Sequence, residues 1–128
     1  MKYLLDTNVL IYYLNGSLSN DTQRLITNIM NQTDWQISVI TKIELLGFRF
    51  DTLADLQTAE QLLIGSTLLP LSDAIVDKTI VLRQKHKLKT PDAIIAATAL
   101  LHNMTLISRN DKDFERIKGL KYSNPFPQ

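Results

Sequence analysis

Short apolar segments alternate with amphipathic segments along this chain, and that alternation restricts the fold more than any other feature of the sequence. The apolar segments predict strands at residues 2–5, 35–40, 66–71 and 105–108, and a final edge strand at 120–122. Apolar residues at helical spacing predict helices at residues 8–14, 20–30, 41–46, 53–63, 74–86, 93–101 and 111–117. Parallel strands need long crossover connections, which these helices supply. The sequence therefore predicts an α/β fold: a single three-layer α/β/α domain over residues 1–128 with a mainly parallel central sheet.

Two of the predicted helices carry capping signals at their starts. Ser72 precedes the first apolar residues of one helix and is expected to cap it. Thr90-Pro91 marks a second start, because proline tolerates the first helical position and the Thr90 hydroxyl is expected to accept a backbone hydrogen bond. The segment that follows is apolar on all sides, so we expect that helix to be buried.

Composition excludes several classes of protein. The chain has 128 residues, of which 45% are hydrophobic, enough for one core and no second domain. It has no cysteine, which excludes disulfides and thiol catalysis. Asp6 and Asn8 interrupt the apolar amino terminus, and no apolar run approaches the roughly 20 residues that span a bilayer, so we expect a soluble, cytoplasmic protein without membrane contact. A net charge of +1 is compatible with a nucleic-acid or a protein partner.

Acidic and amide side chains follow the predicted strands. They are Asp6, Glu44, Asp92, Asn110, Asp111 and Asp113. Ligands of open α/β sheets collect beyond the carboxyl ends of the strands, so we expect these side chains to meet at one edge.

Carboxylates that crowd together repel, and they remain ionised only beside a compensating cation. Hard oxygen ligands without cysteine or a suitably spaced histidine favour Mg²⁺, with Mn²⁺ as a substitute. Such an ion activates water and polarises a phosphate, which is the chemistry of phosphodiester hydrolysis. The pattern therefore favours a metal site with hydrolytic chemistry.

Each acid also has a simpler interpretation. Asp92 alone is a typical first-turn acid that complements a helix dipole, and Asp111 or Asp113 would serve as a helix cap or a solvated charge. Asp6 and Glu44 are harder to explain in this way. Both have apolar neighbours, so we expect them to be buried, where an unpaired carboxylate is costly.

Four ordered motifs resemble those of PIN domains, and specifically of VapC-type toxins from type II toxin–antitoxin systems. They are YLLDTNVLIYYL, ISVITKIELL, LKTPDAIIAATAL and LISRNDKDF, and the closing GLKYSNPF is also similar to the end of these toxins. The resemblance extends from Met1 to about Phe126. It implies a metal-dependent endoribonuclease with a PIN fold, a cognate VapB-type antitoxin and a toxin homodimer.

The resemblance places Asp6, Glu44 and Asp92 on the three metal-binding carboxylates of the family. Many members carry a fourth Asp where this chain has Asn110, which keeps an acceptor oxygen but no charge. Either Asn110 or Asp113 would then hold water or a second ion, and the number of metal ions stays open.

Three further residues have plausible supporting positions beside these acids. The resemblance gives Thr7, Asn8 and Ser108 the role of orienting the carboxylates. Asn8 and Ser108 would equally serve as a helix cap and a turn residue.

Basic residues flank the third and fourth motifs and are candidates for binding RNA phosphates. They are Lys85, Lys87, Lys89, Arg109 and Lys112, with Arg83, Arg116 and Lys118 nearby. The alternative is a set of solvated charges on helix faces. His86 and His102 lack ligand spacing, so we assign them no catalytic role.

Two other functions fit the acidic pattern less well. A catalytically silent PIN-like binding module would explain Asn110. An acid-rich phosphotransfer protein, either a phosphatase or a receiver domain, would need a second acid at the first strand, where Asn8 stands.

Overall fold

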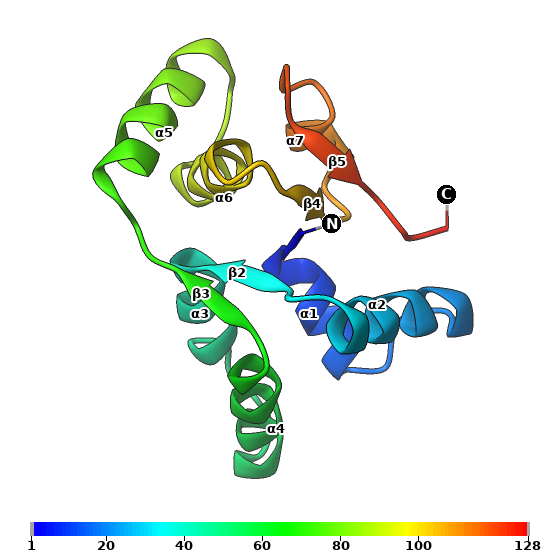
Figure 1. The fold of residues 1–128 in the computed structure, drawn as a ribbon. Helices are drawn as coiled ribbons and strands as arrows, with labels where there is room; N and C mark the ends of the chain where they lie inside the picture. Colours follow the sequence, from blue (N-terminus) through cyan, green and yellow to red (C-terminus); the bar gives the residue numbers. More distant parts are fainter. Residues whose placement is uncertain (1, 128) are drawn as a thin grey trace.

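A sheet of five parallel strands runs through the middle of the molecule (Figure 1). The computed structural model describes residues 2–127. The strand order is β3-β2-β1-β4-β5. The strands are β1 (Tyr3–Leu5), β2 (Gln36–Ser38), β3 (Thr67–Leu69), β4 (Thr105–Ile107) and β5 (Lys121–Ser123). The predicted edge strand near the carboxyl terminus is therefore confirmed, and the described sheet is parallel throughout.

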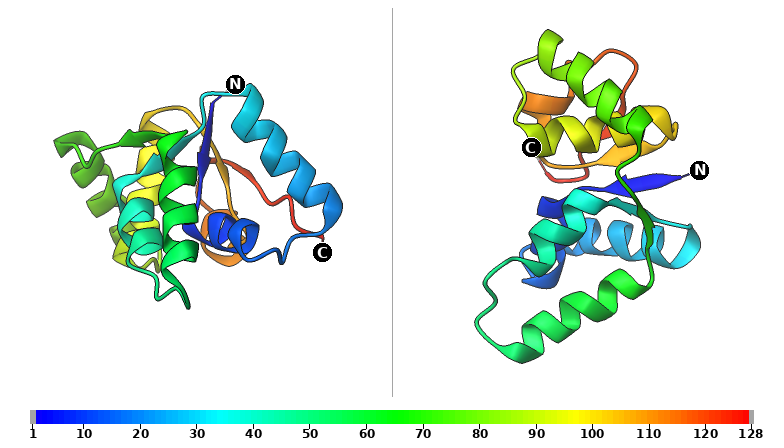
Figure 2. Two further views of the ribbon diagram at one scale, coloured as in Figure 1. Left: turned by 90° about the horizontal axis from the view of Figure 1, so that it is seen from below. Right: turned by 90° about the vertical axis from the view of Figure 1, so that its left-hand side faces the viewer.

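Helices connect the strands and cover both faces of the sheet. They are α1 (Thr7–Leu14), α2 (Asn20–Gln32), α3 (Val39–Leu46), α4 (Leu53–Ile64), α5 (Asp73–Lys85), α6 (Thr90–Leu101) and α7 (Asp111–Phe114). Helices α5 to α7 lie on one face and α1 to α4 on the other (Figures 1 and 2). The predicted three-layer α/β/α architecture is confirmed. No helix within residues 2–127 combines the length and the apolar character that crossing a membrane requires.

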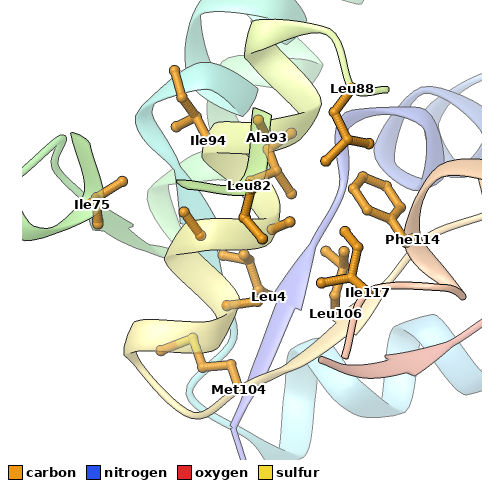
Figure 3. Packing of buried hydrophobic residues seen from close by; sticks show 14 residues of the cluster. Leu4, Ile75, Leu82, Leu88, Ala93, Ile94, Met104, Leu106, Phe114 and Ile117 are labelled. Atoms are coloured by element: carbon orange, nitrogen blue, oxygen red, sulfur yellow. The ribbon is translucent and has the colours of Figure 1, made fainter. Parts of the chain in front are cut away.

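Alternating side chains of the central strands divide the core into two clusters. Leu4 and Leu106 point toward α5 and α6, where they pack with Phe114 of α7 (Figure 3). Leu5 and Ile107, the next residues of the same strands, belong to the cluster on the opposite face. This alternation follows from the two-residue period of a strand. The sheet is therefore covered on both faces, as a parallel sheet requires.

Helix α6 is the most deeply buried helix of the described chain. All residues from 93 to 99 are buried, as the apolar sequence predicts. Four of these seven residues are alanines, whose small side chains allow the close packing of α6 against α5. The amino-terminal end of α6 is thereby held rigidly at the edge of the sheet, which matters because Asp92 lies there.

Several element boundaries differ from the predicted ones. The Ser38 hydroxyl accepts a hydrogen bond from the Ile40 N–H group, so α3 begins at Val39 and β2 ends at Ser38, two residues before the predicted end. Lys89 occupies the capping position of α6 without a side-chain hydrogen bond, so the expected cap by Thr90 is wrong. The expected cap by Ser72 is confirmed. Helix α7 ends at Phe114, three residues before the predicted end.

The pairing of β1 with β4 fixes the geometry of the edge described next. Leu5 pairs with Ile107, so the residues that follow both strands are neighbours. The Asp6 N–H group continues the ladder and donates to the Ile107 carbonyl over 3.0 Å. Asp6 and Ser108 therefore emerge side by side at the carboxyl end of the sheet.

Candidate active site

Asp6 is a buried carboxylate at the junction of β1 and α1. Its side chain is 4% exposed, as its apolar neighbours predict. Oδ1 accepts the Thr7 N–H group over 2.8 Å, and Oδ2 accepts the Ser108 hydroxyl over 2.7 Å and the Asn8 amide over 3.3 Å. Burial nevertheless raises the pKa of Asp6, and the nearby Glu44 adds to the rise against the lowering effect of Ser108 and Thr7. Asp6 is thus held in one orientation but lacks a compensating charge.

Glu44 extends from α3 to the same edge, although it is not buried. The prediction of a buried Glu44 is wrong: the residue is exposed, because the buried face of α3 is formed by Thr41 and Leu45. The Thr7 hydroxyl donates to Glu44 Oε1 over 2.8 Å, and the Thr41 hydroxyl lies 3.2 Å from that of Thr7. Thr7 therefore joins the two acids, since its N–H group contacts Asp6 and its hydroxyl contacts Glu44.

Asp92 is the third residue of α6 and lies within electrostatic reach of the other acids. Its pKa is raised to about 6, first by burial and then by the charges of Asp6, Asp113 and Glu44. The four acids therefore belong to one electrostatic cluster, which we call the acidic edge.

Asn110 contacts the acidic edge through Asp113. Its amide donates to Asp113 Oδ2 over 2.8 Å, and its N–H group donates to the Ser108 hydroxyl over 3.0 Å. The Ser108 hydroxyl consequently contacts both Asp6 and the turn after β4. Asn8 bonds to Asp6 but does not cap α1, because Asp6 itself occupies the capping position.

Asp111 serves the chain differently from its neighbour Asp113. It accepts the Tyr122 hydroxyl over 2.6 Å and the Asn124 amide over 3.0 Å. Burial and this bond raise the pKa of Tyr122, so the phenol stays protonated and donates. Asp111 thus ties the turn after β4 to the carboxyl-terminal segment.

The donors of the acidic edge fit a hard divalent cation in their chemistry. They are carboxylate oxygens, the ligands that Mg²⁺ prefers, and none of the four acids has an ion pair among residues 2–127. Burial is the main cause of the raised pKa values of Asp6 and Asp92, and the neighbouring acids add to it. A nearby cation would favour the ionised form of both. In their present rotamers, no three Asp, Glu or His side chains of the described residues form a closed ligand set.

Most of the predicted RNA-binding cations lie around one hollow. Lys85, Lys87 and Lys89 line it from the end of α5 and the loop before α6, and Lys112 lines it from α7. The hollow has a volume of about 770 Å³ and also includes Asp113 of the acidic edge. We call it the basic hollow.

Arg109, the fifth candidate, has different surroundings. Its guanidinium lies 5.2 Å from the centre of the Tyr12 ring and 5.1 Å from that of Phe126. This geometry is typical of a cation–π contact. The structure thus separates Arg109 from the four lysines.

Three residues that contribute to this region escaped the sequence analysis. Thr41 lies three residues before Glu44, and this helical spacing was the one available sign of their proximity. Tyr122 and Asn124 meet Asp111 only because β5 pairs with β4. No local pattern in the sequence indicates that pairing.

Together the fold and the acidic edge define a class: parallel α/β proteins with a carboxylate cluster at the carboxyl end of the sheet. Comparison with known proteins makes this more specific. The model of the PIN domain family matches residues 3–120. This chain therefore belongs to the PIN domain family, and the predicted resemblance to VapC-type members is confirmed.

Relatives of known structure share the whole fold. The chain is 32% identical to a toxin–antitoxin complex chain from Klebsiella pneumoniae, covering 98% of this chain and 99% of that one with a TM-score of 0.80. VapBC2 from Rickettsia felis, bound to a DNA fragment from its promoter, is 23% identical, covers 97% of this chain and 98% of its own, and has a TM-score of 0.83. Ribonuclease VapC1 from Rickettsia felis is 46% identical over 39 residues, 30% of this chain and 29% of that protein's length.

Proposed function

We propose that this protein is a metal-dependent endoribonuclease of the VapC toxin type that hydrolyses RNA phosphodiester bonds. The observation that carries the proposal is the acidic edge of a PIN domain, where Thr7 joins Asp6 to Glu44 and the charges of both act on Asp92. The ribonuclease name of the VapC1 relative supports the same activity. A site that holds an uncompensated negative charge cannot attract RNA by itself, so the proposal includes Mg²⁺, with Mn²⁺ as a substitute.

When bound, the cation would activate a water molecule and neutralise charge on the phosphate, and Asp6, Glu44 and Asp92 would hold it. The supporting side chains prepare these acids. Ser108 and Asn8 fix the position of Asp6, because both donate to its Oδ2 atom, and the Ser108 bond lowers the pKa of Asp6 against the larger effect of burial. The Thr7 hydroxyl similarly fixes the otherwise exposed Glu44. We therefore assign Thr7, Asn8 and Ser108 to the orientation of the carboxylates.

Between the two candidates for a fourth donor, the contacts favour Asp113. The charge of Asp113 acts on the pKa of Asp92, whereas Asn110 is uncharged and its amide donates to Asp113. Asn110 would then orient Asp113, and Asp113 would hold water or a second ion.

The test is cleavage of a mixed structured RNA pool by the purified chain with Mg²⁺, with Mn²⁺ and with a chelator. Asp6→Asn and Asp92→Asn should abolish metal-dependent cleavage. Asp55→Asn is a matched control, because Asp55 is the exposed third residue of α4, as Asp92 is the third residue of α6. If the folded wild-type chain, free of any antitoxin, cuts nothing with either ion, the ribonuclease proposal fails and a binding module is favoured.

We also propose a VapB-type antitoxin as a partner. The supporting relatives include the toxin–antitoxin complex from Klebsiella pneumoniae and VapBC2 from Rickettsia felis. The chain itself exposes large apolar side chains around α3 and α4, with Ile43 at 63% and Leu53 at 69%. A hollow of about 350 Å³ is lined by apolar side chains such as Ile11 and Phe48 and by charged ones such as Arg49 and Asp51, from the loop between α3 and α4. Exposed apolar surface of this kind favours a protein partner.

A homodimer is the second proposed assembly. Leu71, Val76 and Ile80 expose apolar side chains at the start of α5 and along it. Light scattering after size-exclusion chromatography should give twice the chain mass. A monomer at all concentrations would contradict the dimer.

A further inference from the structure

The loop between α5 and α6 has a fixed shape. The Arg83 guanidinium donates to the Leu88 carbonyl over 3.3 Å, and that of Arg116 donates to the Lys87 carbonyl over 3.2 Å. The Leu88 side chain is 5% exposed and points toward Phe114 of α7 (Figure 3). The loop is therefore held between α5 and the segment after α7 by two hydrogen bonds from arginine side chains to its carbonyls and by one buried side chain.

This fastening determines where the charges lie. With Leu88 turned inward, Lys87 and Lys89 on either side of it line the basic hollow. Lys85 and Lys112 complete its rim from α5 and α7. Arg83 also lines the basic hollow and keeps its charge, because a hydrogen bond to a carbonyl does not neutralise a guanidinium.

The charge of the basic hollow is uncompensated. Within residues 2–127 the single ion pair joins Arg24 to Asp21, away from this site, so none of the four lysines has an acidic partner there. Among the described residues that line the hollow, Asp113 is the one acid, and its Oδ2 already accepts the Asn110 amide. Five like charges around one space, those of the four lysines and Arg83, favour a ligand with several negative groups.

The position of the basic hollow identifies that ligand. Asp113 belongs both to its lining and to the acidic edge, so the two regions adjoin at this residue. A nucleic acid strand whose phosphate lies at the acidic edge carries its next phosphates into the adjoining space. The proposed RNA substrate has a phosphate at every nucleotide, so cations that line a space beside the acidic edge match the strand next to the cleaved bond.

We infer that the basic hollow binds the backbone phosphates of the RNA substrate beside the cleaved bond, and that the fastened loop presents Lys87 and Lys89 for this purpose. This inference rests on the proposed ribonuclease function and adds the path of the substrate to it. Preformed contacts of this kind position a strand without reading its sequence. Binding there should therefore depend strongly on salt and weakly on base sequence.

The test measures binding of a fluorescein-labelled single-stranded RNA oligonucleotide by fluorescence anisotropy. EDTA prevents cleavage, and NaCl is varied from about 50 to about 200 mM. The double variant Lys87→Gln/Lys89→Gln should weaken binding about tenfold at the lowest salt. The slope of the logarithm of the binding constant against the logarithm of the salt concentration should become shallower by about 1.4, because each lost phosphate contact of a single strand reduces that slope by about 0.7.

The matched control is Lys78→Gln/Lys121→Gln, which removes the same charge outside the basic hollow. It should keep the wild-type slope, and circular dichroism should show both variants folded. The inference would be overturned if Lys87→Gln/Lys89→Gln left the salt slope of RNA binding unchanged, or if the control variant changed that slope equally. It would also be overturned if the wild type did not bind the RNA.

The cleavage assay separates the two proposals. If the wild type cleaves RNA but the double variant Lys87→Gln/Lys89→Gln binds with an unchanged salt dependence, the ribonuclease proposal stands and the substrate path through the basic hollow is wrong. If RNA binds through the basic hollow but is not cleaved with either metal, the phosphate-binding site stands and the ribonuclease proposal is wrong.

Discussion

Replacing Asp92 by asparagine should make the metal-free protein more stable at neutral pH. The folded protein raises the pKa of Asp92 from 3.8 to about 6, mainly by burial and by the neighbouring acids. At about 1.36 kcal/mol per pKa unit, ionising Asp92 costs the fold at most about 3 kcal/mol. Asp92 is partly exposed, and solvent screening reduces this to about 1–2 kcal/mol. An asparagine side chain at this position would keep the shape of the carboxyl group and remove that charge.

The sign of the pH dependence follows from the direction of the pKa shift. Because the folded pKa lies above the unfolded one, the folded protein binds the proton more tightly. The destabilisation of the folded wild-type protein by the ionised Asp92 carboxylate is absent below pH 3.8, grows between pH 3.8 and about 6, and is complete above that range. The advantage of Asp92→Asn should therefore shrink to about a third near pH 4.5.

Urea denaturation in EDTA, near pH 7.5 and near pH 4.5, measures both effects. Asp55→Asn serves as the control for losing a first-turn acid from a helix. Addition of Mg²⁺ should stabilise the wild type and not the Asp92 variant, since binding to the folded state alone raises its stability. An Asp92→Asn protein that is less stable than the wild type in EDTA at neutral pH would refute the reasoning, as would a gain that is equal at both pH values.

Two further substitutions probe the support of the acidic edge. Ser108→Ala removes the donor to Asp6 Oδ2, so it should lower the free energy of unfolding by about 1–3 kcal/mol and raise the pKa of Asp6 further. NMR titration of the Asp6 carboxyl measures that pKa, and an unchanged value would show that the hydroxyl is unimportant. Phe114→Ala leaves a cavity at a fully buried position, and urea denaturation should record a loss of about 3–5 kcal/mol, whereas a loss below about 1 kcal/mol would contradict the packing of α7.

Much of the fold could be predicted because it depends on local periodicity. The alternation of strands and helices requires a parallel sheet whatever the exact boundaries are. Asp6 could be recognised in the same way, since an acid directly after the buried pair Leu4-Leu5 lies at the end of a strand. The errors at the starts of α3 and α6 arose where a cap decides the boundary, and both were small.

The exposure of Glu44 could not be predicted from its neighbours. Ile43, which suggested burial, is itself 63% exposed, so α3 carries apolar residues on its outer side as well. The contacts of Thr41 and Tyr122 depend on how distant segments are paired, and that information is absent from any short window of sequence. The same is true of Arg83 and Arg116, which look like RNA-binding cations in the sequence but donate to the carbonyls of a loop.

The central place of β1 in the sheet has a consequence for the timing of synthesis. This strand is made first, yet one of its two neighbours, β4, begins only at Thr105. Until residue 108 has left the ribosome, one edge of β1 is open and Asp6 lacks the hydroxyl that orients it. A nascent chain therefore carries Asp6 and Glu44 without a finished site until β4 has been made. If the chain is the proposed ribonuclease, this order of assembly delays its activity until the turn after β4 has been synthesised.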